Sequence, residues 1–470
     1  MFFQTIDFGI FFVIVFFVYW SVYRWQNLRN YILLGASYVF FGYWNWLFPL
    51  LLLLSSVFTL FAGNLIKASE SKESGKKILI GAIAVNLLIL SFFKYYGYLT
   101  GDWGEKSDGS LNSTVFVEQY IVLPFGVLFF TLQSISYLFD VYRGKLPEKV
   151  TPLDLFLLMA YFPKLLAGPL VRAQQFFKEL NSTADKEGID FVRAISLILI
   201  GFFKKFVLAN YIALQLVDPV YNDPGVYASF DILMAIFAYS LQLYWNLSAY
   251  SDLAIGISLL LGIKLPQNFN QPFRARSLRE FWHSWFITFY AWLKDYVYFP
   301  VRGAISGYRK KIISLLVVCI VGSLWYGTGL NSIVLGLLGA GGLLVEQWLM
   351  QRWKRKKVST RMKIFLTSSV VIYISFLLIF LRSENLTGSF ELLIALFKFT
   401  KADLILTPLT LSLIIWGFAS HFMPKEWGST IVNFFQRLHP LTQAVIIGCA
   451  ILLISTFGFP IEPTIKYFQY

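Results

Sequence analysis

The amino-acid sequence predicts an all-α polytopic membrane protein, and its composition, apolar runs and prolines support this prediction. Hydrophobic residues make up 57% of the 470 residues and charged residues only 14%, and the mean hydropathy is +0.63. A soluble protein of this length would be far less apolar. Several apolar runs approach the roughly 20 residues that cross a bilayer core at about 1.5 Å of rise per residue.

The apolar runs follow one another from end to end of the chain. The long ones are Phe8–Tyr23, Leu47–Ile66, Ile78–Phe93, Ile312–Leu324 with its continuation, Ile364–Leu381 and Ala444–Phe459. The first lacks a basic segment before it, so it is a predicted span and not a cleaved signal peptide. Tyr31–Trp44 is shorter and contains glycine, which predicts a tilted, partial or re-entrant helix. From the run lengths we expect about ten to twelve membrane helices.

Prolines punctuate the middle of the sequence. They are Pro124, Pro152, Pro163, Pro169, Pro219, Pro224, Pro266, Pro272 and Pro300. Because proline breaks helices and biases the preceding residue toward extended backbone, we expect short, tilted and partly re-entrant central helices. Since no internal repeat or low-complexity linker divides the chain, we predict a single membrane-embedded domain over residues 1–470.

The net charge of +14 is concentrated in short connections between apolar runs, which argues against nucleic acid as a partner. Basic connections of this kind lie in the cytoplasm. Counting spans alternately places Lys67–Lys77 inside and the more acidic Gly101–Glu118 outside. The densest basic run, Arg352–Lys357, has two interpretations: contact with anionic membrane lipid or a partner, or a cytoplasmic loop that sets topology. Cys319 and Cys449 each lie alone, so we predict neither a disulfide nor a metal site.

Two later stretches carry a recognisable pattern. Glu280–Thr288 reads E-F-W-H-S-W-F-I-T, and Gly322–Gly327 reads G-S-L-W-Y-G. They resemble the signature region of bacterial membrane-bound O-acyltransferases, the group that contains the alginate O-acetylation membrane protein and the teichoic-acid D-alanyl transfer protein. In that family the stretches usually read E-F-W-x-R-W-H-[IM]-S and G-[LV]-W-H-G. Further matching segments, in family order, are Asn86–Tyr96, Leu123–Gly126, Thr131–Tyr137, Asp140–Gly144, Tyr161–Arg172, Ser248–Gly256, Asn268–Pro272 and the tail Ile465–Tyr470.

The resemblance implies a fold, an activity and a location. The fold is the family's membrane helix bundle in a bacterial cytoplasmic membrane. The activity is transfer of an acyl group, most of all acetyl, from acetyl-CoA or an acyl carrier to an extracytoplasmic polysaccharide or a partner that decorates it. Membrane lipid and a secreted or anchored SGNH-type acyltransferase are the implied partners, and no bound cofactor is implied.

The sequence departs from the family at its histidines. Phe286 and Tyr326 stand where the family has its two motif histidines, and Gly339 stands at a third, in W-G-x-x-H-G. The family's G-x-W-H-G histidine is assigned the proton-handling role, which suits a group with a pKa near 6.5. A phenol titrates near 10, so Tyr326 either donates a hydrogen bond to a carbonyl or fills space. Asn246 and Ala249 also replace the family's frequent Asp and Gly, and we expect impaired transfer.

His283 is the candidate to replace the missing base. If Leu278–Trp292 is one helix, His283 lies one turn from Phe286, with a rise of about 4.5 Å. The alternative is an interfacial histidine on the polar face of that helix. His421 and His439 lie outside the recognised motifs and are predicted to be loop or helix-end residues.

Charged residues beside apolar runs are the other candidates. A basic lining would suit the phosphates of coenzyme A or an acyl carrier, and the predicted substrate-binding residues are Arg172, Arg274, Arg276, Lys294 and Asp295. The alternative is a set of buried pairs that fix the re-entrant helices.

Three hypotheses therefore remain open: an active or impaired acyltransferase, a non-catalytic pseudoenzyme that holds lipid, acyl donor or a partner, and an unrelated polytopic transporter. A transporter would need an inverted repeat with paired broken helices, which the sequence does not contain.

Overall fold

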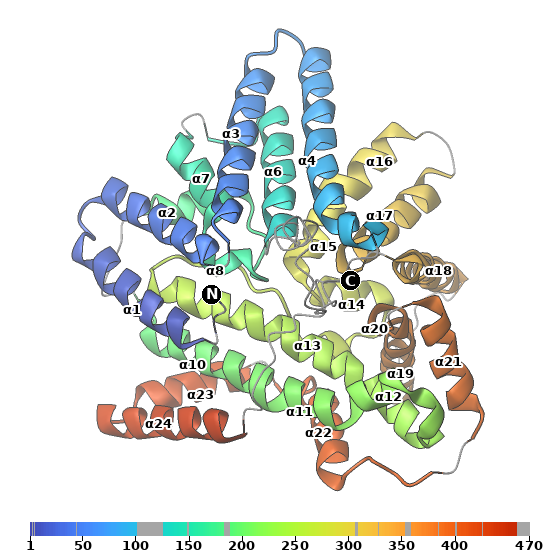
Figure 1. Ribbon diagram of the computed structural model, residues 1–470. Helices are drawn as coiled ribbons and strands as arrows, with labels where there is room; N and C mark the ends of the chain where they lie inside the picture. The colour runs from blue at the N-terminus through green and yellow to red at the C-terminus, as the bar shows by residue number, and fades with distance from the viewer. Residues whose placement is uncertain are drawn as a thin grey trace, which may run out of the picture. The chain divides into compact units, whose positions relative to one another are not determined.

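The computed structural model is predominantly helical, without a β-strand among the residues that it describes (Figure 1). These residues are 1, 3, 5–43, 45–100, 126–147, 150–182, 189–305, 309–327, 329–352, 359–383, 385–399, 402–424 and 426–457. The acidic loop at 101–118, most of the basic run at 352–357 and the aromatic tail at 465–470 lie outside them. The chain forms two compact units, one of Met1–Ala194 with Leu253–Pro266 and one of Ile195–Asp252 with Gln267–Tyr470.

Five helices in the described part of the chain are long and apolar enough to cross a membrane. They are α3 (Leu47–Lys67), the Lys72–Tyr95 part of α4 (Lys72–Thr100), α13 (Ser229–Leu260), α18 (Leu330–Arg352), and α19 (Thr360–Leu377) continued by α20 (Ile379–Arg382). Shorter apolar helices are α1 (Ile6–Ser21), α6 (Val127–Tyr142), α21 (Leu386–Phe397), α22 (Pro408–Ser420) and α24 (Pro440–Phe457). The polytopic, all-helical fold class is confirmed. The count of ten to twelve membrane helices stays a prediction, as does a single domain.

The first unit is built around three helices that stand side by side, α3, α4 and α6 (Figure 1). Thr59 of α3 and Ser134 of α6 share a hydrogen bond of 2.7 Å between their buried hydroxyls. The unit also contains α1, α2 (Gln26–Gly42), α7 (Pro152–Ala160), α8 (Phe162–Leu165) and α9 (Ala173–Leu180). Gly126 precedes α6 with a φ of 87°, and a Cβ there would lie 2.7 Å from the ring of Phe41. Glycine is therefore required at this entry to the helix.

Prolines mark the starts of short helices, as the sequence predicts. Pro152 is in the first turn of α7, and Thr151 caps this helix together with Asp154. Proline suits the first turn because its missing N–H would have no partner there. Pro163 lies in the four-residue helix α8, in a segment whose residues 161–171 are all buried. A buried, broken segment of this kind fits the predicted re-entrant structure.

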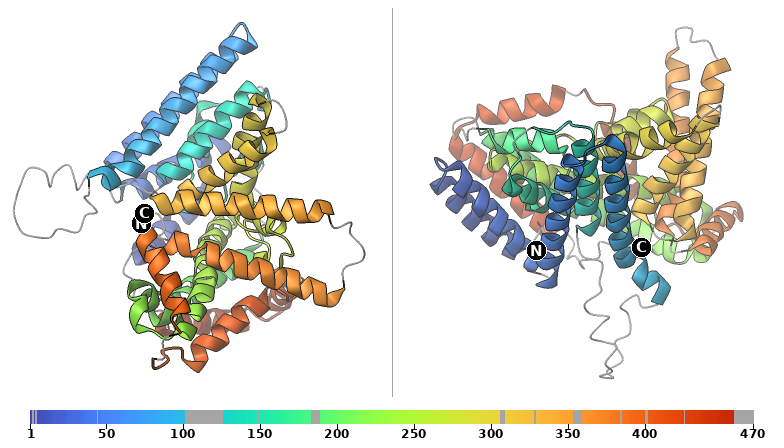
Figure 2. Two further views of the ribbon diagram at one scale, coloured as in Figure 1. Left: turned by 90° about the vertical axis from the view of Figure 1, so that its right-hand side faces the viewer. Right: turned by 90° about the horizontal axis from the view of Figure 1, so that it is seen from above.

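The second unit takes in the larger part of the helices. It starts within α10 (Phe191–Phe202) and continues through the irregular helix made of η1 (Phe203–Ala209), α11 (Asn210–Ile212), η2 (Ala213–Val217) and α12 (Asp218–Asn222), which the short 3-10 turn η3 (Pro224–Val226) follows. After α13 come η4 (Pro272–Arg274), α14 (Leu278–Ser284), α15 (Ile287–Leu293), η5 (Lys294–Tyr298), α16 (Phe299–Ala304) and α17 (Lys310–Tyr326). The unit ends with α18 to α22, α23 (Glu426–Gln436) and α24. Helix α17 packs along α18, as Figure 2 shows in light orange.

Helix α13 is a 32-residue element that the apolar runs of the sequence do not predict. Its buried face carries polar side chains, among them Ser240, Gln242, Asn246 and Ser251, and these interrupt the hydropathy signal. Ser240 donates to the Ser375 hydroxyl of α19 at 2.8 Å. Polar groups buried in a membrane helix need such partners, so the long helix depends on its neighbours.

Candidate functional site

The signature stretch around Trp285 is broken and is not one helix. Helix α14 ends at Ser284, Phe286 has a φ of 43° and α15 begins at Ile287. Backbone hydrogen bonds with the extended segment Asn268–Asn270 stabilise this break between α14 and α15. Asn270 N–H donates to the Ser284 carbonyl at 3.0 Å, and Ile287 N–H donates to the Asn268 carbonyl at 2.8 Å. A continuous helix over 278–292 is therefore wrong, and the one-turn relation between His283 and Phe286 fails with it.

Phe286 lies in an apolar aromatic cluster. Only 2% of its surface is exposed. Its ring stacks on Phe269 at 6.0 Å and 15°, and contacts Phe289 at 5.6 Å. The left-handed backbone of a bulky residue is strained and persists only where the surroundings fix it. The packing of this ring indicates that Phe286 stabilises the break between α14 and α15.

Tyr326 joins the two signature stretches. It is the last residue of α17 and is half-buried. The Trp285 Nε1–H donates to its hydroxyl at 3.4 Å, and its ring meets Phe289 edge to face at 6.2 Å. A donor–acceptor distance of 3.4 Å is long for a hydrogen bond. The Tyr326 hydroxyl is therefore held by a weak hydrogen bond from Trp285, which belongs to the other signature stretch.

His283 faces the surface of its unit. It is exposed on α14, and its ring contacts Tyr290 at 4.6 Å. Burial lowers the pKa of His283, and the nearby charges of Lys294 and Arg279 lower it further. Within the described residues no hydrogen bond or ring contact joins His283 to Tyr326, so the structure does not bring the two predicted catalytic residues together.

The third signature position, Gly339, is buried in α18. A Cβ built there would meet Leu377 of α19 at 4.0 Å, which is ordinary van der Waals contact. The position therefore serves the contact between α18 and α19.

The predicted basic lining is divided between the two units. Arg172 is half-buried at the start of α9 in the first unit, whereas the other four residues belong to the second. Arg274, Arg276 and Lys294 are exposed, and Asp295 is half-buried in η5. Arg274 donates to the Gln271 side chain at 3.5 Å. Their role in substrate binding stays a prediction.

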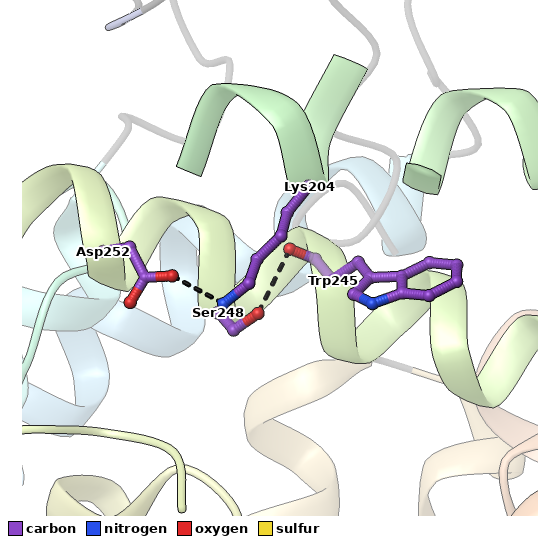
Figure 3. Close-up of polar contacts among 4 residues, drawn as sticks. All are labelled: Lys204, Trp245, Ser248 and Asp252. Carbon is purple, nitrogen blue, oxygen red and sulfur yellow. Dashed lines mark hydrogen bonds and ion pairs between the residues drawn. The ribbon is translucent and has the colours of Figure 1, made fainter. Parts of the chain in front are cut away.

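A partly buried ion pair lies between η1 and α13 (Figure 3). Lys204 Nζ lies 2.6 Å from Asp252 Oδ2, with about a fifth of each side chain exposed (21% and 19%). Ser248, on the same face of α13, donates to the Trp245 carbonyl at 3.5 Å. The ammonium also lies 5.8 Å from the centre of the Tyr244 ring. Two charges this deep in a protein persist because each satisfies the other.

A second lysine of η1 contacts α13 at Asn246, six residues before Asp252. Lys205 Nζ donates to Asn246 Oδ1 at 2.6 Å, and both residues are buried. The sequence analysis named Asn246 and the matching segment Ser248–Gly256, which contains Asp252, but it did not identify the two lysines. Their position inside the apolar stretch 195–209 was the signal that could have found them, because an intramembrane charge is by default functional.

His421 is the functional candidate that the sequence analysis missed. It directly follows α22, as predicted for a helix-end residue, but only 2% of its surface is exposed. Its ring contacts Tyr244 at 4.7 Å and Phe273 at 5.0 Å. Tyr244 in turn lies 6.2 Å from Trp285. The imidazole therefore belongs to the aromatic cluster of the signature stretch, although no motif contains it.

The first unit holds a small cavity beside a buried lysine. Its volume of about 10 Å³ leaves room for about one water molecule. The lining residues are Phe129, Gln133, Leu158, Met159, Lys164, Leu165, Pro169 and Leu170. Lys164 Nζ donates to the Leu158 carbonyl at 2.6 Å, and Gln133 donates to the Val171 carbonyl at 2.8 Å. Both long polar side chains are thus held by backbone carbonyls, and the cavity is too small for a substrate. Among the described residues no group of three or more His, Cys, Asp and Glu side chains is placed to hold a metal ion.

Comparison with known proteins places this arrangement in a family. The family model of the membrane-bound O-acyltransferases matches residues 144–389, which include both signature stretches, η1 and α13. The probable alginate O-acetylase of Pseudomonas aeruginosa is 32% identical over 380 residues, covering 80% of this chain and 71% of the relative.

Two further relatives act on other envelope polymers according to their names. The peptidoglycan O-acetyltransferase of Helicobacter pylori is 30% identical over 388 residues, covering 76% of this chain and 72% of the relative. The teichoic acid D-alanyltransferase of Bacillus subtilis is 25% identical over 303 residues, covering 62% and 72%. The similarity extends well beyond the signature stretches in each case.

Proposed function

Because the chain belongs to the membrane-bound O-acyltransferase family, we propose that it transfers an acyl group to an extracytoplasmic polysaccharide or to a partner that decorates it. Acetyl is the proposed group, since several relatives at 30% identity or more are named for O-acetylation or O-acetyl transfer. The donor is a cytoplasmic thioester, acetyl-CoA or an acyl carrier. The chain lies in a bacterial cytoplasmic membrane, and its acceptor side faces outward.

The proposed transfer is impaired relative to family members that carry the motif histidines. The observation that carries this proposal is the packing of Phe286 and Tyr326. Phe286 stacks in an apolar cluster, and the Tyr326 hydroxyl is met by the Trp285 indole. Neither group accepts a proton at neutral pH. General base catalysis contributes typically 10²–10⁴-fold, so loss of the base at these positions predicts a reduction of that order.

The second candidate function is a pseudoenzyme that holds lipid, acyl donor or a partner without transfer. Phe286, Tyr326 and Gly339 favour it, since none of these three residues has a side chain that titrates near pH 7. Family membership alone does not decide, because a fold does not confer activity. The two functions differ in whether any ester bond forms.

The donor and partner follow from the chemistry of the reaction. The exposed cations Arg274, Arg276 and Lys294 are the proposed contacts for the donor's phosphates. An SGNH-type acyltransferase outside the membrane is the proposed partner, which would receive or complete the transfer.

Deletion of the gene tests the proposed function directly. The envelope and secreted polysaccharides of the deletion strain should lose part of their O-acetyl esters, measured by mass spectrometry after mild alkaline release. A strain carrying the deletion and a plasmid copy is the control. Unchanged ester content in every polymer fraction would favour the pseudoenzyme.

Labelling in intact cells tests the proposed orientation. In a background without Cys319 and Cys449, a cysteine at Ser110 should react with an impermeant maleimide, and one at Ser74 should react only after permeabilisation. Equal labelling of both from outside would overturn the orientation.

A further inference from the structure

The imidazole of His421 is fixed in one tautomer by α22. Its Nδ1 lies 2.9 Å from the Gly417 carbonyl oxygen. A carbonyl only accepts hydrogen bonds, so Nδ1 donates its hydrogen and Nε2 keeps its lone pair in the neutral ring. A carbonyl or carboxylate on the far nitrogen is how proteins orient a histidine whose near nitrogen reacts.

The other ring nitrogen, Nε2, has no hydrogen-bond partner in the described part of the chain. It is buried, and it makes no hydrogen bond to any residue that the structure describes. A buried acceptor left unpaired destabilises the folded chain, and such a group in a native structure calls for an explanation. A ligand that brings a hydroxyl donor to this nitrogen would remove the cost.

The neighbours of His421 connect it to the signature stretches and to a charge. Tyr244 neighbours both the imidazole and the Lys204 ammonium, with a ring centre 4.7 Å from the first and 5.8 Å from the second. Phe273 packs on the imidazole and also lies 6.1 Å from Trp285. Trp285 donates to the Tyr326 hydroxyl. The rings of Tyr244 and Phe273 therefore link the imidazole to Trp285, which contacts Tyr326, one of the positions where the family's chemistry is expected.

We propose that Nε2 of His421 is the proton acceptor for the alcohol that receives the acyl group. This inference depends on the proposed function. The alcohol's hydroxyl gives its proton to Nε2 while its oxygen forms a bond to the thioester carbonyl carbon. The C–S bond then breaks, and the leaving thiolate takes the proton back from Nε2. One ester and one thiol result, and the imidazole ends neutral.

The electrostatics of the site agree with a slow but available base. Burial lowers the pKa of His421 to about 4, the Gly417 carbonyl opposes this shift and the Lys204 ammonium adds to it. The ring is therefore neutral at pH 7, with its lone pair free. A base this weak accepts a proton less readily than one with a pKa near the working pH, in line with impaired transfer.

Two substitutions separate proton transfer from binding. His421→Gln keeps an oxygen acceptor but cannot take up a proton, and His421→Phe loses both. Transfer is measured with the full chain in lipid nanodiscs, radiolabelled acetyl-CoA, and alginate oligosaccharides or muropeptides as acceptors. Binding is measured separately with the same oligosaccharides carrying a fluorophore. His421→Gln should lower transfer about 10²-fold with binding within about threefold, and His421→Phe should weaken binding about tenfold as well.

His439→Gln is the matched control, because His439 is exposed in the turn before α24 and should leave both readouts unchanged. Size-exclusion profile and melting temperature check that each variant folds. If His421→Phe aggregates, His421→Asn replaces it, since its shorter side chain withdraws the acceptor atom.

The outcomes distinguish the two proposals. Transfer by the wild type that His421→Gln leaves unchanged would overturn the role of His421 and leave the proposed function standing. If the wild type forms no ester, the proposed function fails. The binding measurements then test whether Nε2 is a hydroxyl-binding site. Weaker binding by His421→Phe alone would support Nε2 as a hydroxyl site, whereas equal binding by all variants, or none by the wild type, would overturn it.

Discussion

The indole of Trp285 donates to the hydroxyl of Tyr326 at 3.4 Å, and this contact ties the end of α17 to the break between α14 and α15. Both residues lie in signature stretches that are about 40 positions apart in the sequence. The hydrogen bond is long, so its net contribution to folding is at most about 1 kcal/mol. The structure thus gives the tyrosine hydroxyl a structural contact, which can be tested by removing it.

Replacing Tyr326 by phenylalanine should be nearly silent. The ring contact with Phe289 is kept and only the weak hydrogen bond is lost, so acetyl transfer should stay within about threefold and the melting temperature should shift by only a few degrees. Trp285→Phe is the matched control for the donor side. A loss of 10²-fold or more in a folded, normally abundant Tyr326→Phe protein would show that the hydroxyl takes part in catalysis.

His283→Ala should change transfer by less than about threefold. The side chain is exposed, and it contacts Tyr290 and not Tyr326. Proton transfer needs the donor and acceptor heavy atoms about 2.6–3.2 Å apart. His283 is exposed on α14, and its position does not bring the imidazole this close to Tyr326. The same radiolabelled transfer assay measures the effect. A defect as large as that expected of His421→Gln would identify His283 as the base.

Restoring the two signature histidines, by Phe286→His with Tyr326→His, should gain little transfer. Position 286 is 2% exposed and faces Phe269, so an imidazole there would be buried among aromatic rings without a polar partner. Each single substitution is the control for the double one. A rise of 10²-fold in the double variant would show that the scaffold retains the family's original site.

Protein stability should fall on the acid side because of His421. Its pKa is about 4 in the folded chain and near 6.5 when unfolded, so the unfolded chain binds the proton more readily. The contribution of the neutral imidazole is complete above pH 6.5 and is lost as the pH falls toward 4. It amounts to about 3 kcal/mol at most.

Melting temperatures between pH 7.5 and 4.5 measure this loss. Among the described residues, Lys204 and Tyr244 are the titratable neighbours of the imidazole, and both keep their charge state over this range. His421→Gln should flatten the pH dependence, and His439→Gln should not. An unchanged slope in His421→Gln would mean that the imidazole is not held neutral by burial.

The sequence predicts the fold family correctly because its motifs are long and occur in family order. It also predicts the short helices of the centre, since Pro152 and Pro163 lie in the first turns of α7 and α8. The sequence fails at Trp285–Phe286, where the pattern of a helix continues but the backbone pairs with Asn268–Asn270. Tertiary hydrogen bonds override local propensity there.

His421 shows why part of the site could not be predicted. Nothing near it in the sequence marks it as buried, because its neighbours Phe422 and Met423 are exposed. Its burial arises from contacts with Tyr244 and Phe273, which are about 150 to 180 positions earlier in the chain. Only the packing of α22 against these elements brings the imidazole into the aromatic cluster.

The rate of acetyl transfer by the purified chain, measured beside the Pseudomonas aeruginosa relative in the same nanodiscs, tests the central claim most directly. We expect ester formation that is measurable above a lipid-only blank and at least about 10²-fold slower than that of the relative, since the base is weak and the signature histidines are absent. A rate equal to the relative's would contradict impairment. A rate equal to the blank would contradict transfer itself and leave the chain a pseudoenzyme.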